Sequence, residues 1–155
     1  MNDPSPGSQA LTIQQALDLA VEHHNAGRLA EAESIYQQIL QTDPNQPVAL
    51  HLMGLIAFQV GKNEIAVDHI ARALAVQPDY TEAHSHIGLA FQEMGKLEEA
   101  VAHYQEAIAI SPDFAEAHNN LGAGLRELGR QQEVIASSRK AIALQPNLAM
   151  AHYNL

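Results

Sequence analysis

The chain of 155 residues contains no cysteine and no tryptophan, and aromatic residues make up only 5% of it. Without cysteine, a disulfide scaffold, a thiol nucleophile and a thiolate zinc site are all excluded. The scarcity of aromatic residues argues against a β-sandwich, whose strands favour aromatic and β-branched side chains. With 46% hydrophobic residues and abundant alanine, the composition favours closely packed helices instead.

Basic residues are also scarce, since 8 Lys and Arg face 18 Asp and Glu and give a net charge of −10. An acidic chain repels phosphate backbones, so we expect no nucleic-acid partner. The longest apolar run lies near residues 50–60 and is interrupted by His51, Gly54 and Gln59, so it falls short of the ~18 apolar residues of a membrane span. We expect no membrane partner and a cytoplasmic location, with which the absence of cysteine is consistent.

The first ten residues, MNDPSPGSQA, are polar and contain two prolines and one glycine. They lack the basic start and the apolar stretch of a secretory signal. We predict a flexible N-terminal arm over residues 1–10, followed by one folded array over residues 11–155.

The array is an internal repeat of 34 residues. Pro44, Pro78, Pro112 and Pro146 are each 34 residues apart. Two series of glycines keep the same spacing, namely Gly27, Gly61, Gly95 and Gly129, and then Gly54, Gly88 and Gly122. The period divides the chain into the units 13–46, 47–80, 81–114 and 115–148, with a partial unit over 149–155. A residue's position within its unit is called its place below.

Each unit predicts two helices. In the third unit, apolar residues recur at helical spacing on both sides of Gly95, which is a typical helix stop, and Pro112 ends the second helix. Two Asp–Glu pairs have the spacing of capping boxes at the starts of first helices, namely Asp79 with Glu82 and Asp113 with Glu116. Helices of about 14 residues joined by short turns lie antiparallel, so each unit is expected to form a hairpin.

Small residues stand at matching places, where the two helices of a hairpin are expected to approach closely. They are Gly54, Gly88 and Gly122 at place 8, Ala32, Ala66 and Ala100 at place 20, and Ala73, Ala107 and Ala141 at place 27. One hairpin cannot bury its own apolar face, but the next hairpin can cover it. The sequence therefore predicts an all-α solenoid.

From residue 13 onward the chain resembles the tetratricopeptide repeat (TPR) family. The 34-residue period, the small residues at places 8 and 20, Tyr36 and Tyr104 at place 24 and Pro at place 32 carry the resemblance. It implies a right-handed α-solenoid of antiparallel helix hairpins whose first helices line a concave groove. The fourth unit departs from the pattern with Val134 at place 20 and Ser138 at place 24, so we expect its second helix to pack less tightly.

The resemblance implies a protein–protein interaction scaffold that binds a peptide or a partner helix in the concave groove. In the family, the groove-facing places are 2, 5, 6, 9, 12 and 13 of each unit. They supply the candidate binding residues His51, Leu55, Phe58, Gln59, His86, Leu89, Gln92, Asn119, Asn120, Arg126 and Asn154. Amide side chains both donate and accept hydrogen bonds, which suits the backbone of an extended peptide. The alternative is that these Asn and His side chains are solvated or bridge adjacent helices.

A second resemblance is narrower. AEAHNNLG at 115–122, AMAHYNL at 149–155 and YTEAHSHIG at 80–88 resemble repeats from the superhelical arm of O-linked N-acetylglucosamine transferases and their bacterial relatives. That family implies an Asn ladder that grips a peptide backbone; Asn120 and Asn154 match it, whereas His86 and Leu52 do not. The alternative function is therefore an N-terminal, substrate-recruiting fragment of such a glycosyltransferase.

We expect no enzymatic activity from this chain by itself, and no cofactor or metal. It has no G-x-S-x-G nucleophile motif and no phosphate-binding loop. Imidazoles recur at place 4 in His84, His118 and His152, but repeats stack about 10 Å apart and Zn–N bonds are about 2 Å long, so one ion cannot bridge two of them. We expect these three histidines to fill a packing place, and His69 and His103 at place 23 to be exposed.

The chain ends at Leu155, place 7 of the fifth unit, without a polar helix to cover the last apolar face. We expect either a longer array or self-association through this C-terminal face. Partners are thus expected to be proteins or peptides, including a second copy of the chain.

Overall fold

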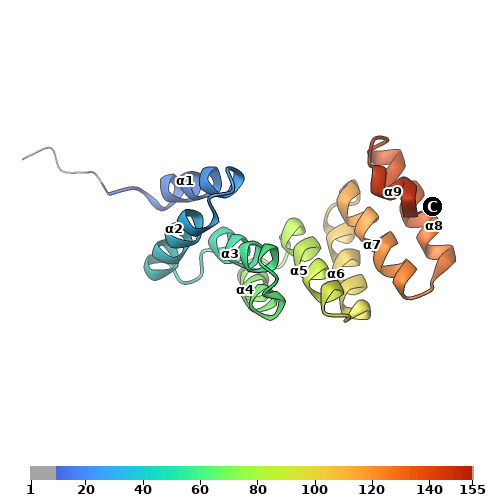
Figure 1. Cartoon of the computed structure of the whole chain (residues 1–155), viewed down its shortest axis with the longest axis horizontal. Helices are drawn as coiled ribbons and strands as arrows, with labels where there is room; N and C mark the ends of the chain where they lie inside the picture. The colour runs from blue at the N-terminus through green and yellow to red at the C-terminus, as the bar shows by residue number, and fades with distance from the viewer. Residues whose placement is uncertain (1–9, 155) are drawn as a thin grey trace, which may run out of the picture.

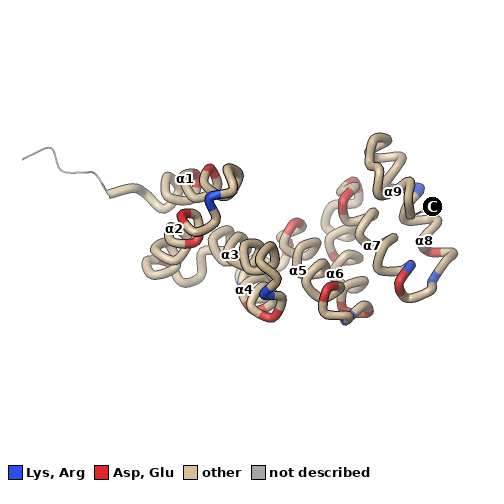
Figure 2. Tube along the Cα trace, viewed as in Figure 1, with Lys and Arg blue, Asp and Glu red and all other residues tan. Residues whose placement is uncertain are grey.

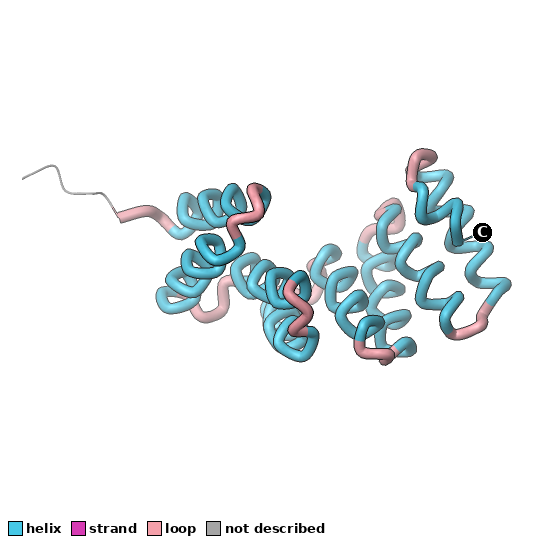
Figure 3. The backbone as a smooth tube through the Cα atoms, viewed as in Figure 1, coloured by secondary structure: helices cyan, strands magenta, loops and turns pink. Residues whose placement is uncertain are grey.

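The computed structural model describes residues 10–154, which form nine helices and no strand (Figures 1 and 3). The predicted N-terminal arm lies, except for Ala10, outside the described residues. The helices are α1 (Ile13–Asn25), α2 (Leu29–Thr42), α3 (Pro47–Gln59), α4 (Asn63–Val76), α5 (Thr81–Glu93), α6 (Leu97–Ile110), α7 (Ala115–Glu127), α8 (Gln131–Leu144) and α9 (Ala149–Asn154).

Consecutive helices pack as hairpins, α1 with α2, α3 with α4, α5 with α6 and α7 with α8, and each hairpin packs on the next. Figure 1 shows the hairpins following one another along the long axis of the molecule. The predicted all-α solenoid is therefore confirmed. Every odd-numbered helix begins at the first residue of one of the 34-residue units.

Glycine ends the first helix of each hairpin, as predicted. Gly27, Gly61, Gly95 and Gly129 have φ between 72° and 77°, the left-handed region in which residues with a Cβ are strained. At Gly95, the N–H donates to the Gln92 carbonyl at 2.9 Å and the next N–H, of Lys96, donates to the Phe91 carbonyl at 2.9 Å. This pair of bonds satisfies two end carbonyls of the helix and turns the chain into the next one.

The two predicted capping boxes are wrong. Helices α5 and α7 have Tyr80 and Phe114 at their N-caps, and in the described structure neither side chain caps its helix. Asp79 and Asp113 precede the N-cap by one residue, so the following glutamates do not reach the third helical position. A complete capping box stands instead at the start of α1, formed by Thr12 and Gln15.

The helices of a hairpin approach closely where the small residues stand. A Cβ added to Gly54 would lie 2.5 Å from Ile70 Cγ1, and one added to Gly88 would lie 2.5 Å from Tyr104 Cε1. At Gly122 the nearest atom, Ser138 Oγ, would be 3.1 Å away. The second and third hairpins therefore require glycine at place 8 more strictly than the fourth hairpin does.

The solenoid curves toward its odd-numbered helices. Helix α3 contacts α5, α5 contacts α7 and α7 contacts α9, whereas the even-numbered helices make no comparable contacts with one another within residues 10–154. Because the odd-numbered helices approach one another more closely, they form the inner surface of the array. The even-numbered helices form the outer surface.

None of the helices between residues 10 and 154 has both the length and the apolar character needed to cross a membrane.

Candidate interaction surface

Hydrogen bonds along the inner surface join side chains that are one repeat plus one residue apart, which is 35 positions. Place 5 of one hairpin bonds to place 6 of the next, and place 12 bonds to place 13. The pairs are His24–Gln59, His51–His86, Ser85–Asn120, Gln92–Glu127 and Asn119–Asn154. We call this set the inner ladder. It ties each odd-numbered helix to the next.

His51 is the most buried of the predicted binding residues that carry an ionisable group. Only 3% of its surface is exposed, its Nδ1 lies 2.9 Å from Tyr80 Oη, and its Nε2 lies 2.7 Å from His86 Nδ1. Burial, together with the neighbouring His86 and His24, lowers the pKa of His51 to about 3. A neutral imidazole has one donor and one acceptor, so these two contacts use both ring nitrogens. His51 therefore joins α3 to α5 and has little surface left for a ligand.

Gln92 links three helices. The Tyr104 hydroxyl, on α6, donates to Gln92 Oε1 at 2.8 Å, and Gln92 Nε2 donates to the carboxylate of Glu127 on α7. Burial raises the pKa of Tyr104 well above its usual value, and the charge of Glu127 adds to this effect. The neutral hydroxyl thus stays available as a donor throughout the physiological pH range.

The predicted asparagines also bridge neighbouring helices. Asn120 Nδ2 donates to Ser85 Oγ at 3.2 Å, and Asn154 Nδ2 donates to the Asn119 backbone carbonyl at 3.4 Å and to its Oδ1 at 3.3 Å. Asn154 is only 3% exposed. The sequence left open whether these amides bind a peptide or are instead solvated or bridge adjacent helices. In the structure, Asn119, Asn120 and Asn154 bridge adjacent helices.

Apolar side chains of the inner surface are not part of the ladder. Leu55 and Phe58 on α3 and Leu89 on α5 are half-buried, and we call these three residues the apolar strip. Gln59 and Arg126 are exposed, and the guanidinium carbon of Arg126 lies 5.0 Å from the centre of the Tyr153 ring. The strip leaves apolar surface open between polar neighbours.

Three of the described inner helices, α1, α5 and α7, carry acidic residues at groove-facing places. Arg126 is the only Lys or Arg among the described inner helices. The exposed carboxylates at their groove-facing places are Asp18, Glu82, Glu93, Glu116 and Glu127, which we call the acidic rim. In Figure 2, the positions of Asp and Glu occur along much of the array, whereas half of the chain's eight basic residues belong to α7, α8 and the turn between them. The inner surface therefore favours a basic partner.

The histidines at place 4 hold the loops that precede them. Nε2 of His84, His118 and His152 lies 2.9 Å from the backbone carbonyl of Pro78, Pro112 and Pro146, respectively. Because a carbonyl only accepts, each Nε2 carries a proton and donates. The sequence contains the signal, since each histidine follows a repeat proline by six residues.

The expectation that His69 and His103 are exposed is wrong, because both are half-buried. The His103 ring stacks on Phe91 with centroids 5.5 Å apart and planes 11° apart, and its Nδ1 lies 3.1 Å from His84 Nδ1. Place 23 therefore faces the neighbouring inner helix rather than solvent.

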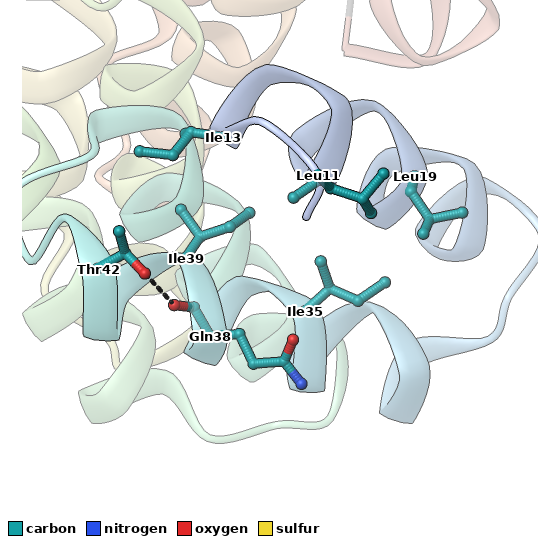
Figure 4. A pocket seen from close by; sticks show the side chains of 8 residues that line it. Leu11, Ile13, Leu19, Ile35, Gln38, Ile39 and Thr42 are labelled. Carbon is teal, nitrogen blue, oxygen red and sulfur yellow. Dashed lines mark hydrogen bonds between the residues drawn. The ribbon is translucent and has the colours of Figure 1, made fainter. Parts of the chain in front are cut away.

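A pocket at the N-terminal end was not predicted from the sequence. It lies between α1 and α2, has a volume of about 350 Å³, and is lined mainly by Leu11, Ile13, Leu19 and Ile35 (Figure 4). The sequence feature that could have indicated this pocket is the pair of apolar residues Leu11 and Ile13, near the start of the first helix. In the structure, 57% of the Leu11 surface and 37% of the Ile13 surface are exposed.

Residues 24–87 match a family model described as tetratricopeptide repeat, and residues 92–123 match one described as TPR repeat. Together the two matches cover more than half of the chain. The chain belongs to the tetratricopeptide repeat family. Its TPR hairpins explain the 34-residue spacing of the prolines and glycines.

Solved structures share the TPR fold at low sequence identity. A crystal structure of MamA is 23% identical, with a TM-score of 0.79 over 89% of this chain and 81% of that one. TTC0263, a thermophilic TPR protein of Thermus thermophilus, is 23% identical, with a TM-score of 0.77 over 90% and 77%. A chain of the APC/C hetero-tetramer Cut9–Hcn1 is 19% identical, with a TM-score of 0.87 over 93% of this chain but only 29% of that one. No curated protein matches the sequence.

Proposed function

We propose that this TPR protein is an interaction scaffold that holds a peptide or a partner helix against its inner surface. The observation that carries the proposal is a difference between the polar and the apolar side chains of that surface. The polar residues of the inner ladder bond to one another, whereas the apolar strip of Leu55, Phe58 and Leu89 is only partly buried. Partly buried apolar side chains on the inner helices gain free energy when a partner covers them.

The charge of the surface favours a basic partner. The acidic rim belongs to α1, α5 and α7, and the only Lys or Arg on the described inner helices is Arg126. Helix α3, which carries Leu55 and Phe58, has no Asp or Glu. A segment that presents two or three apolar side chains flanked by Lys or Arg complements both features.

A display library of random peptides, selected on the full chain, tests this proposal. We expect the selected peptides to combine apolar residues with Lys or Arg, and their affinity to fall as the salt concentration rises. In fluorescence anisotropy, the double variant Leu55→Ala, Leu89→Ala should bind them about tenfold more weakly, because it removes two apolar contacts.

The matched control is Leu74→Ala, which removes the same side chain from a half-buried site on the outer helix α4. It should leave the dissociation constant unchanged. Selected peptides that bind the double variant as tightly as the parent protein would place the binding surface elsewhere.

The second candidate function is the substrate-recruiting arm of an O-linked N-acetylglucosamine transferase-like enzyme. Asn120 and Asn154, which occupy consecutive positions of the inner ladder, favour it. Their amides are engaged between helices, so gripping a peptide backbone would require them to exchange partners. The gene sequence that follows Leu155 tests this candidate, since it requires a downstream glycosyltransferase domain.

The chain by itself is proposed to have no catalytic role, and its cytoplasmic location stays a prediction.

Self-association through the C-terminal face also stays a prediction. Met150 and Tyr153 on α9 are 55% and 73% exposed, and a second copy could cover them. Sedimentation velocity over a range of protein concentrations tests it. A sedimentation coefficient that corresponds to the monomer at the highest protein concentration would exclude such an assembly.

A further inference from the structure

One half-buried aromatic ring on α5 packs against two apolar clusters, one that includes Ile70 of α4 and one that includes Val101 and Tyr104 of α6. Phe91, at place 11 of the third hairpin, stacks on the His103 imidazole with centroids 5.5 Å apart. The Lys96 ammonium lies over the same ring, 5.9 Å from its centroid. An imidazole at place 23 and an ammonium at place 16 thus hold one phenyl ring.

The second hairpin keeps both partners of this ring but lacks the ring itself. One period earlier, His69 replaces His103 and Lys62 replaces Lys96, whereas Ala57 stands in place of Phe91. A methyl group therefore occupies the place at which the third hairpin has a phenyl ring.

A pocket is present where the ring is missing. It lies between α2 and α4, has a volume of about 380 Å³, and is lined by Ala57, Lys62 and His69 together with apolar residues such as Leu29, Ile56 and Ile65. Ile65 is 49% exposed, so the pocket opens to solvent. Its volume falls within the range of about 300–1,000 Å³ that is usual for ligand pockets.

The pocket is lined by one ammonium, of Lys62, and one carboxylate, of Glu33. The face of a ring is electron-rich and complements the Lys62 ammonium. Burial and the nearby Arg72 lower the pKa of His69, although Asp68 and Glu33 oppose the shift, so the imidazole is neutral at pH 7. His69 Nδ1 meets no hydrogen-bond partner within the range that the structure covers, because Leu50 stands where the third hairpin has His84. The neutral His69 imidazole lines the pocket, just as the His103 imidazole contacts Phe91 one repeat later.

We propose that the pocket between α2 and α4 binds an aromatic side chain of a partner protein, whose ring stacks on His69 beside Lys62. The internal repeat supplies the argument, because the third hairpin shows which side chain this set of neighbours accommodates. The site lies between the outer helices α2 and α4, and Met53, Ile56 and Ala57 of α3 close it on one side. None of its lining residues belongs to the apolar strip or to the inner ladder. The protein can therefore contact one partner at two places, or two partners at once.

N-acetyl-phenylalaninamide is the probe for this site, and N-acetyl-leucinamide is its apolar control. Titration followed by NMR should give saturable shifts of the His69 ring and the Ile65 methyl groups at millimolar probe concentrations. The leucine probe should bind about threefold more weakly, because it cannot interact with the Lys62 ammonium through a ring face. Equal affinities for the two probes, or no shift with either, would overturn the proposal.

Three variants locate the binding. Ala57→Phe should fill the pocket with the chain's own ring and abolish the shifts, while circular dichroism checks that it is folded. Lys62→Met alters an exposed side chain and should lower the affinity for the phenylalanine probe to that for the leucine probe. Phe91→Ala should open a second site and add shifts at His103.

Shifts that persist in a folded Ala57→Phe variant would overturn the proposal. If that variant does not fold, Lys62→Met decides, since an unchanged preference for the phenylalanine probe would count against the site. The peptide selections on the inner surface are independent of these results, so either proposal can fail alone.

Discussion

The middle of the array and the fourth hairpin follow one backbone pattern but bury different side chains. In α3 to α6, the polar groups of His51, Tyr80 and Tyr104 have hydrogen-bond partners, whereas His69 Nδ1 has none within the described residues. In α7 and α8, Ser138 stands at the place of Tyr104, is fully buried, and its Oγ has no hydrogen-bond partner among residues 10–154. Place 24 therefore forms a buried hydrogen bond in the third hairpin. In the fourth hairpin it leaves a buried hydroxyl unpaired, which costs free energy.

The difference shows what the repeat does and does not determine. The period places Gly88 and Gly122 at equivalent positions, but the residue at place 24 decides how closely the second helix presses on them. A backbone pattern thus fixes where side chains meet, whereas stability depends on the particular pair. Four substitutions or changes of condition test this, from the largest expected effect to the smallest.

Gly88→Ala should destabilise the protein by about 2–3 kcal/mol, because the new Cβ would lie 2.5 Å from the Tyr104 ring. Gly122→Ala is the matched control. Its Cβ would lie 3.1 Å from Ser138 Oγ, and the better helix propensity of alanine, about 1 kcal/mol, offsets this contact. Urea unfolding followed by circular dichroism measures both, and equal losses would contradict the difference between the hairpins.

Acidification should weaken the middle of the array first. His51 has a pKa of about 3 in the folded protein and about 6.5 in the unfolded chain, so the unfolded state binds more protons below pH 6.5. Its contribution is complete above pH 6.5 and falls by about 2 kcal/mol between pH 6.5 and 5. The lowered pKa of His86 acts in the same direction. Unfolding free energies across this pH range measure the effect.

His51→Gln is the control for this pH dependence, since glutamine can donate and accept but does not titrate in this range. Its stability should change less steeply between pH 6.5 and 5 than that of the parent protein. Identical slopes would show that His51 is not the titrating group.

Tyr104→Phe should cost about 1 kcal/mol, because it removes the hydrogen bond to Gln92. Tyr36, at the same place of the first hairpin, is the matched control. It is equally buried, but its hydroxyl finds no partner in the described part of the chain. Tyr36→Phe should therefore leave stability unchanged or raise it slightly. Thermal unfolding of both variants checks the comparison, which equal losses would refute.

Ser138→Ala should stabilise the protein by up to about 1 kcal/mol, since it removes a buried hydroxyl without a partner. Ser137→Ala, at the neighbouring, 9% exposed residue, is expected to change stability less. A loss of stability in Ser138→Ala, measured by urea unfolding, would mean that the hydroxyl has a stabilising contact in solution.

Much of the fold was predictable because it depends on spacing. The glycine stops and the helix pairs follow from residues such as Gly95 and Pro112, whose backbone preferences are local. The capping boxes were predicted wrongly because their assignment depends on a helix boundary, and Asp79 lies one residue outside it.

The candidate surface was predictable only in part. The groove-facing places identified Leu55 and Leu89, but not that His51 and Asn154 are buried between helices. Their burial depends on contacts between residues 35 positions apart. This spacing is set by how neighbouring hairpins pack in three dimensions. No single repeat carries this information, so the period of 34 could not reveal the ladder.

The most direct test of the account is the position of a bound partner. A selected peptide with a spin label, added to protein with labelled leucine and valine methyl groups, broadens the signals of nearby methyls. The account predicts strong broadening at Leu55 and Leu89 on the inner helices and little at Leu74 and Val76 on α4. Broadening of Leu74 and Val76 that leaves Leu55 and Leu89 sharp would contradict it.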